Sequence, residues 1–179
     1  SLSAGGWLLP DAPLFLAMMV AVTMLAGILF DDAPRAVTLR WMLAGVAAGV
    51  AMLSKYHGVF VLGGTFLLLL SSPPHRKWLA HPGPYLGALV AFALFSPVVY
   101  WNAQHHWVSF LFQGGRAGGN GGLNPGAMLT NIAGQLVWAL PWIWVPLAAS
   151  MWGAFRAGRE HAERWFLLCL SAPIVTVFT

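Results

Sequence analysis

One lysine lies inside one of the most apolar stretches of the chain. Lys55 occurs in the pentapeptide Ser54-Lys55-Tyr56-His57-Gly58, in the middle of residues 41–70. Beyond Tyr56 and His57, that stretch carries no other ionisable side chain. A lysine at membrane depth costs about 2.5–3.5 kcal/mol on insertion scales, so it is usually retained to hold an ion or a phosphate, or at a surface turn. Lys55 is therefore the first candidate for chemistry; the alternative is a lysine that snorkels from a helix end.

Two further charged residues could act with Lys55 on a phosphate-bearing substrate. Asp11 precedes a long apolar segment and could bind or activate a polar substrate; alternatively, it caps that helix. Arg116 lies among six glycines between residues 114 and 122. Glycine amides can approach an anion there and Arg can bind phosphate with two hydrogen bonds, although a mobile surface loop is the alternative. The stretch lacks the Gly-Lys-Ser/Thr of a P-loop, so nucleotide binding has no support.

Several uncharged or weakly basic side chains are candidates for lining the same cavity. They are Tyr56, His57, Asn102, His105 and Gln113. The adjacent pair His105-His106 does not have the spacing of a zinc site, so no metal is expected. The single cysteine lies in an apolar segment, so no intrachain disulfide can form.

The composition indicates an integral membrane protein built from helices. The chain is 59% hydrophobic and 8% charged, with a mean hydropathy of +0.72, whereas soluble domains average about 25% charged residues. Its apolar stretches are continuous and do not alternate, which favours a helical bundle over a barrel. The net charge of +4 comes from nine basic residues scattered over several loops, a pattern that orients a membrane protein and gives no sign of nucleic-acid binding.

The sequence predicts one membrane domain over residues 1–179 with about six membrane segments. These are residues 13–30, 41–54, 58–70, 85–101, 127–152 and 165–179. Residues 41–70 as one helix would be roughly 45 Å long, more than the ~30 Å hydrocarbon core needs. We therefore expect two arms that meet at residues 54–58, each roughly 20 Å long and short of a full span.

The distribution of basic residues supports the same break. With it, loops 31–40, 71–84 and 153–164 share one side and hold seven basic residues, against two, Lys55 and Arg116, on the other. The positive-inside rule then makes the three loops cytoplasmic. Asp11, Lys55 and the polar loop 102–126 would share the opposite face, with Lys55 in a recess below the membrane surface.

The ends of the chain suggest a piece of a longer protein. Residues 1–7 lack the basic region and cleavage site of a signal peptide, and no methionine begins the chain. The last residues, Phe178-Thr179, fall within an apolar run. We expect a fragment cut at both ends.

Three stretches together resemble bacterial glycosyltransferase family 39, which includes relatives of protein O-mannosyltransferases and of the aminoarabinose transferase that modifies lipid A. The motifs are Pro10-Asp11-Ala12-Pro13-Leu14, then Leu43-Ala44-Gly45 running on to Leu53-Ser54-Lys55-Tyr56, and then Ser96-Pro97, Trp101-Asn102-Ala103-Gln104-His105, Trp107-Val108-Ser109-Phe110 and Phe112-Gln113. The resemblance covers nearly all of the chain in order.

The resemblance implies an all-α GT-C fold in the bacterial inner membrane, with a catalytic cavity on the periplasmic face. It also implies a polyprenyl-phosphate sugar as donor, a lipid, protein or glycan as acceptor, and inverting displacement; the sequence identifies no cofactor. Asp11 matches the family's second acidic position, Lys55 its lysine near the donor phosphate, and Arg116 its loop arginine. The family's first acidic motif, which carries the base, would precede Ser1, so we expect this piece to be inactive alone.

Two other functions are compatible with buried charges in a membrane protein. A secondary transporter can have broken helices, but it predicts a second broken segment in an inverted repeat, which the sequence does not show. A non-catalytic membrane scaffold would have no need for Asp11, Lys55 and Arg116 to converge on one face.

Overall fold

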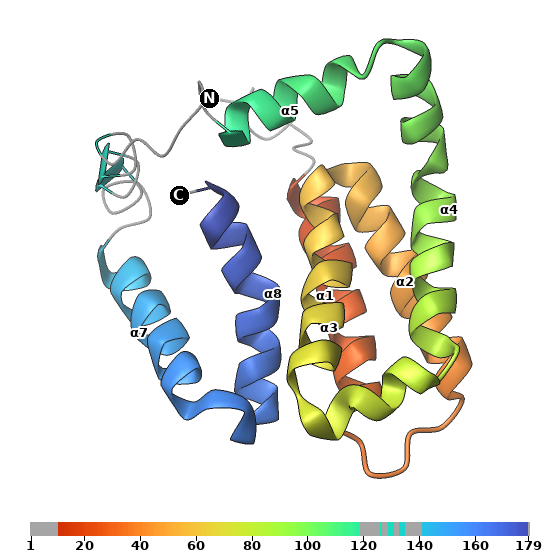
Figure 1. The fold of residues 1–179 in the computed structure, drawn as a ribbon, viewed down its shortest axis with the longest axis vertical. Helices are drawn as coiled ribbons and strands as arrows, with labels where there is room; N and C mark the ends of the chain where they lie inside the picture. The colour runs from red at the N-terminus through yellow and green to blue at the C-terminus, as the bar shows by residue number, and fades with distance from the viewer. Residues whose placement is uncertain (1–10, 119–125, 127–128, 131–132, 135–140, 179) are drawn as a thin grey trace, which may run out of the picture. The chain divides into compact units, whose positions relative to one another are not determined.

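The computed structural model describes residues 11–118, 126, 129–130, 133–134 and 141–178 (Figure 1). All secondary-structure elements in these residues are helical, as predicted for an all-α membrane chain. The chain divides into two compact units, Ser1–Tyr100 and Trp101–Thr179, which are described separately below.

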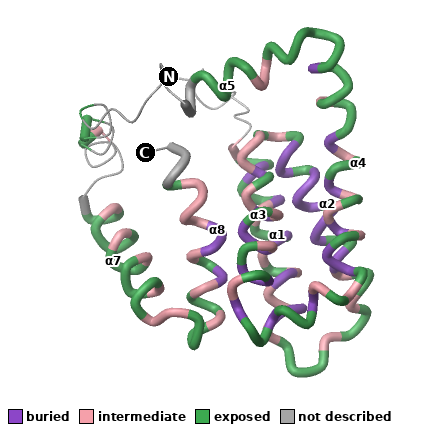
Figure 2. Tube along the Cα trace, viewed as in Figure 1, coloured by how far each residue is buried: buried purple, intermediate pink, exposed green. Residues whose placement is uncertain are grey.

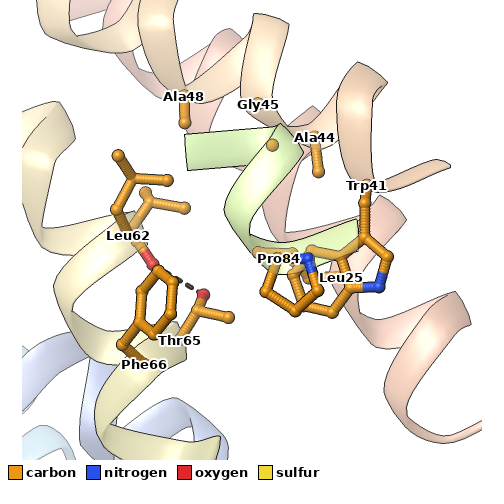
Figure 3. A pocket seen from close by; sticks show the side chains of 11 residues that line it. Leu25, Trp41, Ala44, Gly45, Ala48, Leu62, Thr65, Phe66 and Pro84 are labelled. Atoms are coloured by element: carbon orange, nitrogen blue, oxygen red, sulfur yellow. Dashed lines mark hydrogen bonds between the residues drawn. The ribbon is translucent and has the colours of Figure 1, made fainter. Parts of the chain in front are cut away.

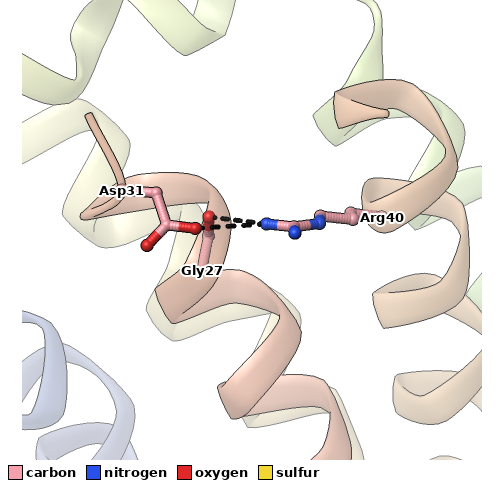
Figure 4. A network of polar contacts seen from close by, with 3 residues as sticks. All are labelled: Gly27, Asp31 and Arg40. Atoms are coloured by element: carbon pink, nitrogen blue, oxygen red, sulfur yellow. Dashed lines mark hydrogen bonds and ion pairs between the residues drawn. The ribbon is translucent and has the colours of Figure 1, made fainter. Parts of the chain in front are cut away.

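The first unit begins with two helices packed along their lengths. Helix α1 (Asp11–Leu29) and helix α2 (Val37–Ser54) are joined by a short connection that contains two aspartates and a proline. Arg40, in the first turn of α2, donates from Nη1 to the backbone oxygen of Gly27 at 3.0 Å and to Oδ2 of Asp31 at 3.3 Å (Figure 4). Arg40 therefore binds a carbonyl near the end of α1, where the partial negative charge of the helix favours a cation.

The expected break between the two arms is present. Helix α2 ends at Ser54, Lys55 is extended with φ −160° and ψ 140°, and a 3₁₀ turn, η2 (Tyr56–Gly58), leads into helix α3 (Val59–Ser71). Gly58 is buried, and a Cβ there would overlap the backbone nitrogen of Met52. The absence of a side chain at Gly58 thus allows the turn to pack directly on the end of α2.

One prediction about these arms was wrong. Helix α2 starts at Val37, not at residue 41, and its 18 residues are long and apolar enough to cross a membrane. The predicted membrane segment began after Arg40. In the structure this arginine lies in the first helical turn, where it is bonded to the end of α1. Only α3, with 13 residues and a length of roughly 20 Å, is too short to span alone.

The segment expected to be a loop at residues 71–84 is largely helical. A 3₁₀ helix, η3 (Pro73–Ala80), follows Ser72 and is bent by 113° from the preceding helical segment. It is held by a buried hydrogen bond of 2.9 Å between Ser72 Oγ and His75 Nδ1, and by edge-to-face packing of Trp78 on Trp41. Because η3 contacts the first turn of α2, it lies at the Arg40 end of the first unit.

Helix α4 (Gly83–Gln104) packs closely on α2 through small residues. A Cβ on Gly45 would overlap the backbone oxygen of Gly87, and one on Gly49 would lie 3.0 Å from the Cβ of Leu94. The pair Gly45 and Gly49 therefore allows the two backbones to approach, as small residues do between membrane helices. Buried residues recur along α1, α2 and α3 (Figure 2).

Among the described residues, three helices are long and apolar enough to cross a membrane: α1, α2 and α4. The number is up to four if the bent pair formed by Tyr56–Ser71 and Pro73–Ala80 is counted as one broken span. The described part of the chain is therefore that of an all-α, multi-pass membrane protein.

Within the described residues, the second unit contains the end of α4 and three α-helices with defined bounds. These are α5 (Val108–Gly118), α7 (Pro141–Ala157) and α8 (Ala162–Phe178), with a 3₁₀ turn, η4 (Gly158–Glu160), between α7 and α8. The prediction of an irregular loop over residues 102–126 was wrong for α5. The segment expected at residues 127–152 is described only in part, since residues 127–128, 131–132 and 135–140 lie outside the described residues.

Candidate functional site

An ion pair joins the two charged residues of the first unit singled out by the sequence. Lys55 Nζ donates to Asp11 Oδ1 at 2.7 Å. Both side chains are close to half exposed, 44% for Lys55 and 42% for Asp11. The pair is therefore accessible to a ligand, and its contribution to stability is small because exposed ion pairs are worth about 0–1 kcal/mol.

The backbone around Lys55 is fixed on both sides of the residue. Its N–H donates to the oxygen of Ala51 at 2.9 Å, which completes the last turn of α2. Its carbonyl accepts from the N–H of Gly58 at 3.0 Å, which closes the 3₁₀ turn. The extended residue between these two bonds places the lysine side chain beside the first turn of α1. Asp11 lies in that turn, where the helix dipole favours a carboxylate.

Tyr56 and His57 continue the turn and contact aromatic neighbours. The Tyr56 ring packs edge-to-face on Phe95 of α4 with centroids 5.9 Å apart, and the His57 ring lies 6.4 Å from that of Phe60. The contact with Phe95 shows that the break between α2 and α3 lies beside Phe95 of α4. Helix α4 continues from Phe95 at least to Tyr100 within the first unit, roughly 7 Å further along its axis. The Lys55 turn thus lies short of the end of α4.

Basic residues of the first unit gather at the end opposite to Lys55. Arg40 lies in the first turn of α2, and Arg76 and Lys77 belong to η3, which contacts the end of α1 and the start of α2. The contacts are Phe30 with His75, at a centroid distance of 5.5 Å, and Trp41 with Trp78, at 6.2 Å. With Arg35 in the α1–α2 connection, four cations lie at this end and Lys55 alone at the other.

The remaining candidates belong to the second unit. Asn102 is fully buried, and its Oδ1 accepts the N–H of Ser109 at 3.2 Å, so its amide helps to hold the corner between α4 and α5. The His105 ring stacks on Trp101 with centroids 4.1 Å apart. Gln113 is exposed on α5.

The backbone at Arg116 differs from the sequence prediction. Arg116 lies within α5, as do Gly114 and Gly115, whose amides were expected to form part of an open cradle for an anion. Backbone amides inside a helix are directed to the carbonyl four residues earlier. That cradle is absent from the described residues of the stretch, and the side chain of Arg116 lies outside what the structure describes.

An apolar cleft lies elsewhere in the first unit (Figure 3). It is lined by Ala44, Gly45 and Ala48 of α2 together with residues of α1, α3 and the start of α4. Its polar side chain, Thr65, donates to the backbone oxygen of Val61 at 2.6 Å and is thereby satisfied. The residues that line the cleft include no charged group for a phosphate.

The buried pair of Ser72 and His75 is a polar feature that the sequence analysis missed. Only their spacing of three residues, which brings side chains together across a helical turn, could have indicated it. The pair satisfies its own polar groups at the start of η3 and lies at the basic end of the unit.

Comparison with known proteins decides the family. Residues 4–101, more than half of the 179 residues, match the family model for dolichyl-phosphate-mannose-protein mannosyltransferases. The chain belongs to this family. The matched region contains Asp11, Lys55, Tyr56 and His57, and it stops before His105 and α5. No curated protein and no solved structure matches the chain.

The family confirms the resemblance to glycosyltransferases stated from the sequence. It indicates glycosyltransferase activity, with a lipid-linked sugar donor and an acceptor as partners in general. The transporter and scaffold alternatives gain no support from the match.

Proposed function

We propose that the full-length protein transfers a sugar from a polyprenyl-phosphate donor to an acceptor hydroxyl at the periplasmic face of the bacterial inner membrane. The acceptor oxygen attacks the anomeric carbon while the bond from that carbon to the phosphate oxygen breaks. Configuration inverts, polyprenyl phosphate leaves with the bonding electrons, and the acceptor proton passes to a base. Such a step requires a cation beside the leaving phosphate and an acid residue beside the acceptor.

The Asp11–Lys55 pair is the observation that carries this proposal. A lysine ammonium group has three donor hydrogens, and the bond to Asp11 uses one of them. The other two are available to a phosphate oxygen at this partly exposed position. In the proposed mechanism, Lys55 offsets the negative charge that grows on the phosphate as the sugar leaves.

Asp11 is assigned to the acceptor side of the reaction. A phosphate that binds Lys55 is a second anion for the same cation, so it weakens the hold of Lys55 on the carboxylate. Asp11 can then accept a hydrogen bond from the acceptor hydroxyl and support removal of its proton. Tyr56 and His57, in the same turn, are proposed to line the cavity beside the pair.

The periplasmic assignment follows from charge. Four basic residues of the first unit lie at the end opposite to Lys55, and cytoplasmic loops carry an excess of lysine and arginine. The continuation of α4 past the level of Tyr56 is compatible with a recessed Lys55 turn, even though α2 is itself long enough to span.

A transfer assay in membranes tests the proposal. Membranes from cells that produce the full-length protein receive radiolabelled polyprenyl-phosphate sugars, tested as separate mannose, glucose and aminoarabinose donors, and incorporation into the acceptor fraction is counted. Lys55→Met should lower turnover at least about tenfold, since a charged hydrogen bond is worth roughly 1.5–3 kcal/mol. Lys77→Met removes the other lysine of the chain, at the opposite end of the first unit, and should retain activity.

Asp11→Asn provides the second arm of the same assay. Asparagine caps a helix about as well as aspartate, so the fold should be retained while the charge is lost. Asp32→Asn is its matched control in the α1–α2 connection. Near-normal turnover by both Lys55→Met and Asp11→Asn at wild-type protein levels would refute the assignment of these residues.

A further inference from the structure

Helix α5 begins near a membrane surface because it directly follows the membrane-spanning helix α4. Helix α4 has 22 residues and a length of roughly 33 Å, enough to cross the ~30 Å hydrocarbon core. It starts near the basic end of the first unit and passes Tyr56 at Phe95, so it runs toward the Lys55 end. Three residues separate its last residue, Gln104, from the first residue of α5.

The corner between the two helices has a fixed and unusual backbone. His106 and Trp107 both have positive φ, 54° and 59°, a conformation that non-glycine residues rarely adopt. Asn102 stabilises this corner in two ways: its backbone oxygen accepts the N–H of Trp107 at 2.8 Å, and its buried Oδ1 accepts the N–H of Ser109. The two left-handed residues change the direction of the chain after α4, so α5 does not continue the membrane span.

The sequence of α5 divides into an apolar and a polar face. Val108, Leu111 and Phe112 follow the spacing of one helix face and are 52%, 68% and 61% exposed. Trp107 is 45% exposed and stacks on Phe110, which extends this apolar side. Ser109 and Gln113 lie one turn apart on another side of the helix. In water, the exposed apolar face would be costly, because each large side chain left unburied forfeits about 1.5–3 kcal/mol.

We propose that α5 is an interfacial helix that lies on the surface of the lipid bilayer that α4 crosses. Its apolar face, defined here as Trp107, Val108, Leu111 and Phe112, enters the boundary between headgroups and acyl chains, and its polar side faces water. Helices with this division of side chains bind in the plane of the interface, and tryptophan is enriched at that depth. The occupant of the apolar face is the lipid, supplied by the same bilayer that α4 crosses. This inference is independent of the proposed chemistry of Lys55.

Nitroxide labels on the full-length protein in vesicles test the orientation of α5. Single cysteines replace Leu111, Phe112, Ser109 and Gln113 in a Cys169→Ser background, and the protein is reconstituted in phosphatidylcholine–phosphatidylglycerol vesicles. Collision of each label with oxygen, which concentrates in lipid, is compared with collision with a water-soluble nickel chelate. Labels at residues 111 and 112 should show a severalfold higher oxygen-to-nickel ratio than labels at 109 and 113.

Two results would overturn the proposal. Free access of the nickel chelate to all four labels would place α5 away from the bilayer, and shielding of all four from both reagents would show that protein covers the apolar face. If Cys169→Ser does not accumulate, the same labels are placed in the natural background, since Cys169 is only 2% exposed. The signal of the parent protein treated with the label is then subtracted, and the comparison between the two faces is unchanged.

Discussion

Lys55 and Asp11 form a 2.7 Å ion pair although 44 residues separate them in sequence. Lys55 lies at the break between α2 and α3, and Asp11 lies in the first turn of α1. The pair thus joins three helix ends of the first unit at one point. A second pair, Arg40 with Asp31, joins α1 and α2 at their other ends. The two pairs differ in their surroundings. Lys55 is the single basic residue at its end of the first unit, whereas four basic residues lie at the end of Arg40.

Exchange of the two charges separates a structural pair from a functional one. In the variant Asp11→Lys/Lys55→Asp, the attraction between the residues is retained but each charge is in the other's place. If the pair only joins helix ends, this variant should regain the activity lost in Lys55→Asp alone. We expect no recovery, with turnover at least about tenfold below wild type, because the phosphate requires a cation at position 55. Transfer in membranes at matched protein levels measures this, and recovery to near-normal turnover would contradict the proposal.

Gly58 is predicted to be essential for the geometry of the Lys55 turn. A Cβ at this position would overlap the backbone of Met52, and backbone cannot shift as a flexible side chain can. Gly58→Ala should therefore move the turn away from α2 and weaken the Asp11 contact, at a cost of about 1–3 kcal/mol in stability. Gly153→Ala is the control, because a Cβ there meets no atom within 4 Å. Apparent melting temperatures in detergent should fall for Gly58→Ala and stay unchanged for the control.

The helical class and the break at Lys55 could be predicted from sequence because both depend on local chemistry. Continuous apolar runs specify helices in a membrane, and a polar pentapeptide with a glycine inside such a run marks a turn. The start of α2 was predicted too late in the chain because Arg40 was assigned to the loop, and its bond to Gly27 of α1 is a contact between distant segments that the sequence does not reveal. The same limit applies to α5, where glycines at 114 and 115 suggested a loop and the structure has a helix.

The candidate site was predictable in part. Charge counting placed Asp11 and Lys55 on one face, but it could not show that they bond to each other, since that depends on how α1 packs beside the break. The role of Asn102 in the corner depends on the left-handed backbone of His106 and Trp107, and a bulky tryptophan does not suggest positive φ. Contacts between distant segments therefore account for most of what the sequence did not reveal.

The contact between α2 and α4 should not tolerate even a methyl group at Gly45. The added Cβ would overlap the backbone oxygen of Gly87, so the two helices would have to separate. Overpacking of this kind costs about 1–3 kcal/mol. Gly63→Ala, in α3, is the matched control, because its Cβ would meet no atom within 4 Å. We expect a lower apparent melting temperature in detergent for Gly45→Ala only, and equal values for the two variants would contradict this packing.

The orientation of the first unit can be tested by labelling single cysteines in intact cells. Arg35, Arg40, Arg76 and Lys77 lie at the end of the unit that includes η3, so this end should be cytoplasmic. Pro74→Cys, at an exposed position of η3, should react with a membrane-impermeant maleimide only after the cells are broken. Gln104→Cys, exposed at the end of α4, should react in intact cells, and both are made in a Cys169→Ser background. Labelling of Pro74→Cys from outside, with Gln104→Cys protected, would reverse the orientation and place Lys55 on the cytoplasmic face, where a periplasmic transferase could not use it.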